Sequence, residues 1–201
     1  MLIANNLSFI KDNKKIFSDL GFCLSVGSCL ILKGGNGSGK TSLLKILAGI
    51  SKPSAGEVFW GETTIDNLGT DFTGDSEFIG HSNFLKRDLT IRENLEFHAK
   101  LNGSVESVDA ALNFFGISDL ANKKTRNLSA GQQKKALLAK LLSCPTTAWF
   151  LDEPSINLDK AAKEQLHGLI KTRIKEDGLV VMATHDEIFF DLGPKLELED
   201  F

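Results

Sequence analysis

The chain has 201 residues, of which 42% are hydrophobic and 24% are charged, as in one globular domain with a sizeable core or a core with a small subdomain. The formal net charge of -3 leaves no basic excess, so the totals argue against nucleic acid as a partner. No apolar run approaches the ~18 residues that a membrane span needs, so we expect any membrane role to depend on a partner.

The N-terminal region predicts a β-rich start. The first residues lack the basic and long apolar regions of a signal peptide. Residues 2–32 have the alternating apolar pattern of strands separated by turns. Cys23 and Cys29 lie here, and together with Cys144 they lack metal-ligand spacing, so we expect reduced, buried thiols.

A phosphate-binding loop follows directly. Apolar residues 29–32 lead into Gly34-x-x-x-x-Gly39-Lys40-Thr41, and a helical pattern begins at once. Glycines allow a tight turn that aims backbone N–H groups at anionic oxygens, and the start of the helix adds its own. We expect a nucleoside triphosphate here, with Lys40 at the β- and γ-phosphates and the Thr41 hydroxyl on Mg²⁺. A plain glycine-rich turn is the alternative, but the lysine, the hydroxyl and both flanks argue against it. The loop residues expected at the nucleotide are Gly34, Gly35, Asn36, Gly37, Ser38, Gly39, Lys40, Thr41 and Ser42.

The middle of the chain changes character. Residues 62–77 are polar and acidic and predict a loop-rich segment. Residues 84–128 predict mostly helix, and the capping box Thr90-x-x-Glu93 opens the first of these helices. We therefore expect a single domain over 1–201 with a helical subdomain inserted at 84–128.

The last third alternates between strands and helices. Buried strands are predicted at 148–151 and 179–183, with a helix at about 160–176 between them. This alternation predicts an α/β fold with a mostly parallel sheet that carries helices on both faces. No second phosphate loop occurs, so one nucleotide domain is expected.

Acidic residues and a histidine follow these two strands, where α/β sheets place ligands. Asp152 ends the first strand and suits a water-mediated contact to Mg²⁺, and Glu153 is a candidate base for activating water. His185 follows the second strand. A solvated acidic turn and a structural histidine are the alternatives, and the position at the carboxyl ends of buried strands favours the site.

Taken together, these motifs resemble the ABC-type ATPases over nearly the whole chain. Residues 128–132, Leu-Ser-Ala-Gly-Gln, resemble the signature segment that separates this family from other phosphate-loop proteins. The order of the phosphate loop, the signature, Asp152-Glu153, the loop 157–159 and His185 also fits. The resemblance implies an ABC-type nucleotide-binding domain of the phosphate-loop NTPase fold, with an antiparallel β part beside the parallel sheet and an inserted helical subdomain.

The resemblance also implies roles for individual residues. Glu153 would be the general base, and His185 would contact the γ-phosphate. Ser129 and Gly131 would complete the ATP site of a second subunit, and Asp159 would communicate across that dimer. ATP would therefore be sandwiched between two copies of the chain, which hydrolysis then separates.

Two positions depart from the family pattern. The family stacks adenine on an aromatic residue upstream of the phosphate loop, and Lys11 stands at the matching place. Phe9 or Phe17 is the candidate substitute. The family also expects a glutamine where this chain has Ser82, so we expect slow basal hydrolysis.

Within the family, the sequences of several segments resemble those of the ATP-binding subunits of the cytochrome c maturation transporter. This is the CcmA type, the supposed haem exporter. The segments are Ile79-Gly80-His81, residues 55–60 and residues 128–133. This resemblance implies a peripheral ATPase on the cytoplasmic side of the inner membrane, docked through its helical subdomain to a CcmB-like integral membrane subunit. The alternative is a soluble ABC ATPase in cofactor or cluster assembly. A translation-associated ABC protein would have paired nucleotide domains and basic linkers, which this sequence lacks.

Overall fold

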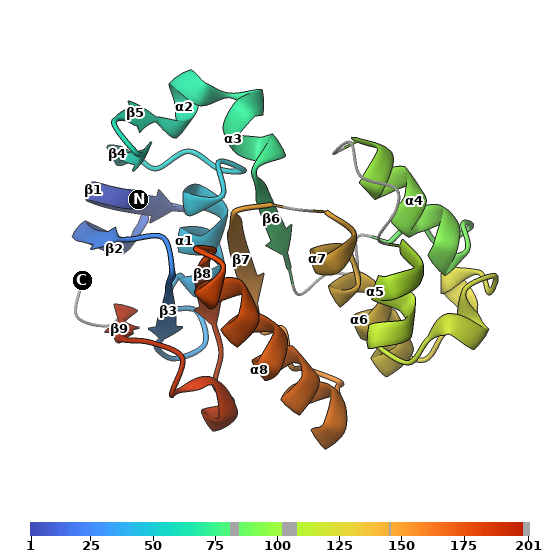
Figure 1. The fold of residues 1–201 in the computed structure, drawn as a ribbon. Helices are drawn as coiled ribbons and strands as arrows, with labels where there is room; N and C mark the ends of the chain where they lie inside the picture. Colours follow the sequence, from blue (N-terminus) through green and yellow to red (C-terminus); the bar gives the residue numbers. More distant parts are fainter. Residues whose placement is uncertain (81–84, 102–107, 145, 199–201) are drawn as a thin grey trace.

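Two β-sheets enclose the helix that follows the phosphate loop (Figure 1). The computed structural model describes residues 1–80, 85–101, 108–144 and 146–198. The first sheet is antiparallel with the order β2-β1-β4-β5, and its strands are β1 (Leu2–Lys11), β2 (Lys14–Leu24), β4 (Ala55–Trp60) and β5 (Thr63–Thr64). The second is parallel with the order β6-β7-β8-β3-β9, and its strands are β3 (Ser28–Lys33), β6 (Ser76–Ile79), β7 (Ala148–Asp152), β8 (Leu179–Ala183) and β9 (Lys195–Glu197). The predicted parallel sheet with an antiparallel part is confirmed.

The parallel sheet is covered on both faces, which explains its central strands. Every residue of β7 and β8 is buried, as expected for strands that have helices or a second sheet on each side. In the register between these strands, Asp152 lies opposite Ala183. The residues that follow both strands therefore emerge at one edge of the sheet.

Helices fill the space on either face. The helix α1 (Lys40–Leu47) packs four apolar side chains between the two sheets and ends at Gly49, whose φ of 70° suits glycine. The helix α8 (Lys160–Lys175) covers the opposite face and starts at Asp159, which caps it by accepting a hydrogen bond from the Ala162 amide at 2.8 Å. The remaining helices are α2 (Ile65–Leu68), α3 (Thr70–Gly74), α4 (Ile91–Leu101), α5 (Val108–Phe114), α6 (Ala130–Leu138) and α7 (Lys140–Ser143), with 3-10 turns η1 (Ser118–Leu120), η2 (Thr125–Asn127) and η3 (Glu187–Phe189).

The helices α4 to α7 gather at one side of the sheets (Figure 1). The predicted capping box is confirmed, because the Thr90 amide donates to Glu93 Oε2 at 2.7 Å and the Glu93 amide donates to Thr90 Oγ1 at 3.1 Å. Behind it, Ile91, Leu95 and Leu112 join a shared core with α7. Within the described residues, no helix is long and apolar enough to cross a membrane.

The expectation of a loop-rich segment at 62–77 is wrong. These residues contain β5, α2, α3 and the start of β6. Ile65 and Phe72 are buried among the side chains beneath α1, and Phe72 packs against Phe150 with 6.4 Å between ring centroids. Two apolar anchors therefore fix short helices in a polar segment, which local composition does not reveal.

A buried polar cluster fastens α4 to the edge strand β6. His98 Nε2 lies 3.1 Å from Glu77 Oε2, and His98 Nδ1 lies 2.8 Å from Cys144 Sγ. Lys140 Nζ donates to Glu77 Oε1 at 2.9 Å. Burial alone would lower the pKa of His98, but the hydrogen bonds to Cys144 and Glu77 and the charge of Glu77 raise that pKa to about 9. The pKa of Glu77 is lowered, because His98 and Lys140 outweigh its burial. We call these four residues the Cys144 cluster.

The His98 pKa predicts a pH-dependent stability. Because the folded pKa of about 9 exceeds the ordinary 6.5, the contribution of His98 is complete below about pH 6.5 and disappears as the pH rises through about 9. The free energy of unfolding of the wild type should therefore exceed that of His98→Gln most at about pH 6 and least at about pH 10. Urea unfolding of both proteins across this range measures the difference, and a difference that does not change with pH would contradict the assignment.

Candidate functional site

The backbone of the phosphate loop has the shape that an anion cradle requires. Gly34, Gly37 and Gly39 have φ values of 137°, 88° and 99°, which side chains other than glycine rarely adopt. A Cβ on Gly34 would lie 2.6 Å from Ser38 Oγ, and one on Gly39 would lie 2.5 Å from Ile16 Cγ2. Conformation and space both require glycine at Gly34 and Gly39, and conformation alone favours it at Gly37.

The loop carries two buried polar groups. Lys40 is buried, and its Nζ donates to the carbonyls of Gly34 at 2.6 Å and Gly35 at 2.9 Å, which holds the ammonium across the loop. Ser38 Oγ is buried and has no hydrogen-bond partner within the described residues. A phosphate oxygen would give the Lys40 ammonium an anionic partner, so the loop fits a nucleotide phosphate.

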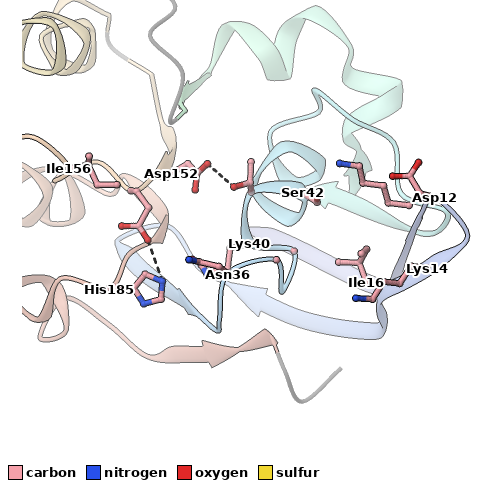
Figure 2. Close-up of a pocket in the computed structure, with 14 residues that line it drawn as sticks. Asp12, Lys14, Ile16, Asn36, Lys40, Ser42, Asp152, Ile156 and His185 are labelled. Atoms are coloured by element: carbon pink, nitrogen blue, oxygen red, sulfur yellow. Dashed lines mark hydrogen bonds and ion pairs between the residues drawn. The ribbon is translucent and has the colours of Figure 1, made fainter. Parts of the chain in front are cut away.

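A hydrogen bond joins the end of the loop to the acidic end of β7. Thr41 Oγ1 donates to Asp152 Oδ2 at 2.8 Å, and Asp152 is buried (Figure 2). A hydroxyl and a carboxylate in contact form the kind of oxygen donor set that Mg²⁺ prefers beside substrate phosphates. These two side chains therefore fit the predicted metal position.

Glu153 adopts an unusual conformation beside His185. Its φ is 46°, and its amide donates to the carbonyl of Ala183 at 2.9 Å, which fixes the strained residue against β8. Glu153 Oε1 lies 3.6 Å from His185 Nε2. Burial raises the pKa of Glu153, and the charges of His185 and Lys40 only partly oppose this. The carboxyl group is therefore a stronger base than an exposed glutamate.

These side chains share one cavity of about 920 Å³. Figure 2 shows Asp152 and His185 on one side of Lys40, and Asp12, Lys14 and Ile16 on the other. The walls are formed by Lys11, Asp12, Lys14, Ile16, Asn36, Gly37, Gly39, Lys40, Thr41, Ser42, Asp152, Glu153, Ile156 and His185. The cavity thus joins the predicted phosphate, metal and base positions.

The proposed aromatic substitutes for adenine stacking do not line this cavity. Phe17 is fully buried in the core and stacks on Phe9 with 6.0 Å between ring centroids. The cavity wall at this end is formed by Lys11 and Ile16 instead. Phe17 is therefore wrong as a candidate, because it is buried in the core, and Phe9, which is partly buried and packs against that core, does not line the cavity either. Ser82, the other departure, lies outside the described residues.

The signature residues lie apart from the cavity of their own chain. Ser129 is exposed and caps α6, with Gln132 completing a capping box. A Cβ on Gly131 would lie 2.8 Å from the carbonyl oxygen of Asn157, so only glycine lets α6 pack this closely on the turn after Glu153. Lys135 Nζ also lies 3.1 Å from Asp159 Oδ2. Neither Ser129 nor Gly131 lines the walls described above.

Sequence reasoning missed Lys134, which is buried on α6. Burial lowers the pKa of Lys134 to about 8, and the charges of Asp152 and Glu153 act in the opposite direction. Its ammonium makes no hydrogen bond or ion pair within the described residues. Lysine is almost never buried without a partner, but nothing in the local pattern around 134 distinguishes it from an exposed helical lysine.

The comparisons with known proteins agree on one family. A family model described as ABC transporter matches residues 17–156. The chain is 40% identical over 94% of its length to a protein of Nitrosomonas europaea, covering 90% of that protein, and 37% identical over 98% of its length to one of Paramagnetospirillum magneticum, covering 94%. Both are named cytochrome c biogenesis ATP-binding export protein CcmA. The chain belongs to the ABC transporter family and to its CcmA group. It is therefore an ABC-type ATPase that binds ATP, as the motifs predicted.

Solved structures share the fold of this ABC protein. An ABC transporter ATP-binding protein from Pyrococcus furiosus superposes with a TM-score of 0.85 and 24% identity, over 100% of this chain and 98% of that one. A bacterial ABC transporter cassette, solved as a dimer, superposes with a TM-score of 0.88 and 23% identity, over 98% of this chain and 95% of that one. The architecture is thus that of the ABC cassette.

The position of Lys134 predicts an effect on divalent cations. Lys134→Met removes a positive charge near Asp152 and Glu153, so it should strengthen Mn²⁺ binding to the ADP-bound protein by about threefold or more. Electron paramagnetic resonance of free Mn²⁺ measures this affinity. Lys171→Met, which removes an exposed lysine paired with Asp191, is the matched control and should leave it unchanged. Weaker or equal Mn²⁺ binding in Lys134→Met would exclude Lys134 from the electrostatics of the site.

Proposed function

We propose that the chain hydrolyses MgATP as the energy-coupling subunit of a membrane transporter in cytochrome c biogenesis, the system to which the resemblance assigns haem export. The observation that carries the proposal is the single cavity shared by the phosphate loop, Asp152, Glu153 and His185. Relatives that match this chain over more than nine-tenths of its length are named export proteins, which favours transport over soluble cofactor or cluster assembly.

Binding of ATP is assigned to the phosphate loop. Backbone amides from Gly34 to Ser42 surround the β- and γ-phosphates, and Lys40 exchanges its carbonyl partners for phosphate oxygens. Thr41 and Asp152 would hold Mg²⁺, which neutralises developing charge on the phosphates when bound. The base and ribose lie toward Lys11 and Ile16, where the wall has no aromatic ring, so we expect weak discrimination between purine bases.

Hydrolysis is assigned to Glu153 and His185. The Glu153 carboxylate accepts the proton of the attacking water, and its raised pKa brings it nearer to neutrality than an exposed glutamate. His185 lies beside it at 3.6 Å and contacts the γ-phosphate. Because the base must be ionised, turnover falls as the pH drops through the raised pKa of Glu153.

A second copy of the chain completes each site in this proposal. Ser129 and Gly131 lie at the exposed start of α6, apart from their own cavity, where a partner's ATP could reach them. Asp159 follows Glu153 in the same turn and is tied to α6 through Lys135, which suits communication between the sites. A related cassette fold was solved as a dimer bound to ADP and Pi. We therefore propose a homodimer with ATP sandwiched between the copies.

The membrane partner is assigned to the helical subdomain, 84–128. Phe97 and Leu101 lie one turn apart on α4 and are 46% and 70% exposed, so two large apolar side chains lie side by side on this helix. They suit an integral, CcmB-like membrane subunit, with this chain held as a peripheral protein at the cytoplasmic side of the inner membrane. The net charge of -3 offers nothing to nucleic acid.

The role of Glu153 is tested by Glu153→Gln. Loss of the base should slow ATP turnover by about 10²-fold or more, while MgATP binding persists and an ATP-bound dimer accumulates. Steady-state ATPase assays and light scattering after gel filtration measure the two effects. Glu164→Gln, an exposed change on α8, is the control and should match the wild type. Wild-type turnover in Glu153→Gln would remove Glu153 from catalysis.

The docking surface is tested by Phe97→Ser with Leu101→Ser. Loss of the apolar surface should reduce co-sedimentation with membranes that contain the transporter subunit by about tenfold, and ATP affinity should not change. Ile10→Ser removes an exposed apolar side chain on β1 and serves as the control. Undiminished co-sedimentation of the double variant would place the docking surface elsewhere, and binding to protein-free liposomes would contradict recruitment by a partner.

A further inference from the structure

The three cysteines of the chain occupy three different surroundings. Cys23 is exposed on β2, so the expectation that all three are buried is wrong for this one. Cys29 and Cys144 are each only 1% exposed. The two buried thiols differ in their neighbours, because Cys144 belongs to the Cys144 cluster described above.

The Cys144 cluster has the order of groups found at nucleophilic cysteines. The sulfur contacts His98 Nδ1 at 2.8 Å, and the other ring nitrogen, Nε2, lies 3.1 Å from Glu77 Oε2. Lys140 holds the second oxygen of the same carboxylate at 2.9 Å. A thiol, an imidazole and an orienting carboxylate in a row activate cysteine in unrelated folds. These four residues come from β6, α4, α7 and the residue that follows it, so the arrangement exists only in the folded chain.

The charge on the ring distinguishes Cys144 from Cys29. With the pKa of His98 raised to about 9, the ring is protonated at neutral pH and donates one N–H to Glu77 and the other to the sulfur. An imidazolium in hydrogen-bond contact with a sulfur can protonate the group that leaves when the sulfur reacts. At Cys29, burial raises the pKa to about 12, which keeps the thiol protonated and inert.

Burial decides which reagents we expect to reach the sulfur. Cys144 is 1% exposed, and the side chain of its neighbour His98 is 21% exposed. We expect a neutral oxidant of nearly the size of water to approach such a sulfur after a small displacement of the surrounding side chains. A bulky alkylating reagent would need the helix α4 to separate from β6.

We propose that Cys144 is a peroxide-reactive thiol whose oxidation to the sulfenic acid releases His98 and loosens α4 from β6. The sulfur attacks one peroxide oxygen, so that an S–O bond forms, the O–O bond breaks, the sulfur is oxidised and the peroxide is reduced. His98 donates its Nδ1 proton to the departing hydroxide, which leaves as water, and the proton that the Cys144 S–H group loses as it reacts passes to Nδ1 and restores the imidazolium. The product carries an oxygen in the 2.8 Å contact between sulfur and ring, so the ring must move.

The first test compares the three thiols in one protein. The native wild-type chain is treated with hydrogen peroxide at neutral pH in the presence of dimedone, and labelling at each cysteine is followed by peptide mass spectrometry. Cys144 should be labelled at least about tenfold faster than Cys29, although both are equally buried. A polyethylene-glycol maleimide should label only Cys23 in the native state. Equal peroxide rates at Cys144 and Cys29 would overturn the proposal.

Two variants separate activation from simple exposure. His98→Gln keeps a polar side chain but removes the imidazolium, so Cys144 labelling should fall to the rate of Cys29. Labelling at the wild-type rate or faster, with Cys29 still protected, would mean that the ring does not activate the sulfur. Should Cys29 become labelled as well, the variant has lost its native packing, and its labelling no longer reports on the role of the ring. The unfolding midpoints of the wild type and Cys144→Ser then test the proposal. Peroxide should then lower the unfolding midpoint of the wild type but not of Cys144→Ser, and equal shifts in both would overturn the proposal.

Discussion

The hydrogen bond between Thr41 and Asp152 is the contact on which the rest of the site depends. It joins the first turn of α1 to the carboxyl end of β7, which are 111 residues apart. The distance of 2.8 Å is possible only because β3 and β7 both pair with β8 in parallel, so that their ends finish at the same edge. The approach of Thr41 to Asp152 depends on the buried strands, on the glycines of the loop and on the packing of α1 between the two sheets.

The charges of the site are arranged around that contact. In the proposed site, Lys40 lies toward the phosphates, and Asp152 and Glu153 lie toward the metal and the attacking water. Lys134 approaches the acids from α6 and offsets part of their mutual repulsion, while His185 does so from the end of β8. Protein carbonyls hold the Lys40 ammonium in place, so in the proposed site a substrate phosphate would replace existing hydrogen bonds rather than water.

The sequence predicted what local pattern encodes. Three features combine a motif with flanking apolar residues, which indicate the neighbouring strand or helix. They are the phosphate loop, the capping box at Thr90 and the acids at the end of β7. Residues 62–77 were misread because two buried anchors outweigh their polar composition. Lys134 and the pairing of His98 with Cys144 were missed because they depend on contacts between distant segments, the latter 46 residues apart. Whether a polar side chain is buried depends on the fold and not on the residues beside it in the sequence.

The close packing of Gly131 on the carbonyl of Asn157 has a consequence for how the molecule can vary. This contact and the ion pair between Lys135 and Asp159 hold α6, the helix that begins at the signature residues, against the turn that begins at Glu153. In the proposed dimer, the start of α6 contributes to the ATP site of the other copy, and Glu153 acts in the ATP site of its own copy. Because these contacts join α6 to the turn, a substitution in this turn changes both ATP sites at the same time. Asymmetry between the two sites would have to arise elsewhere in the chain.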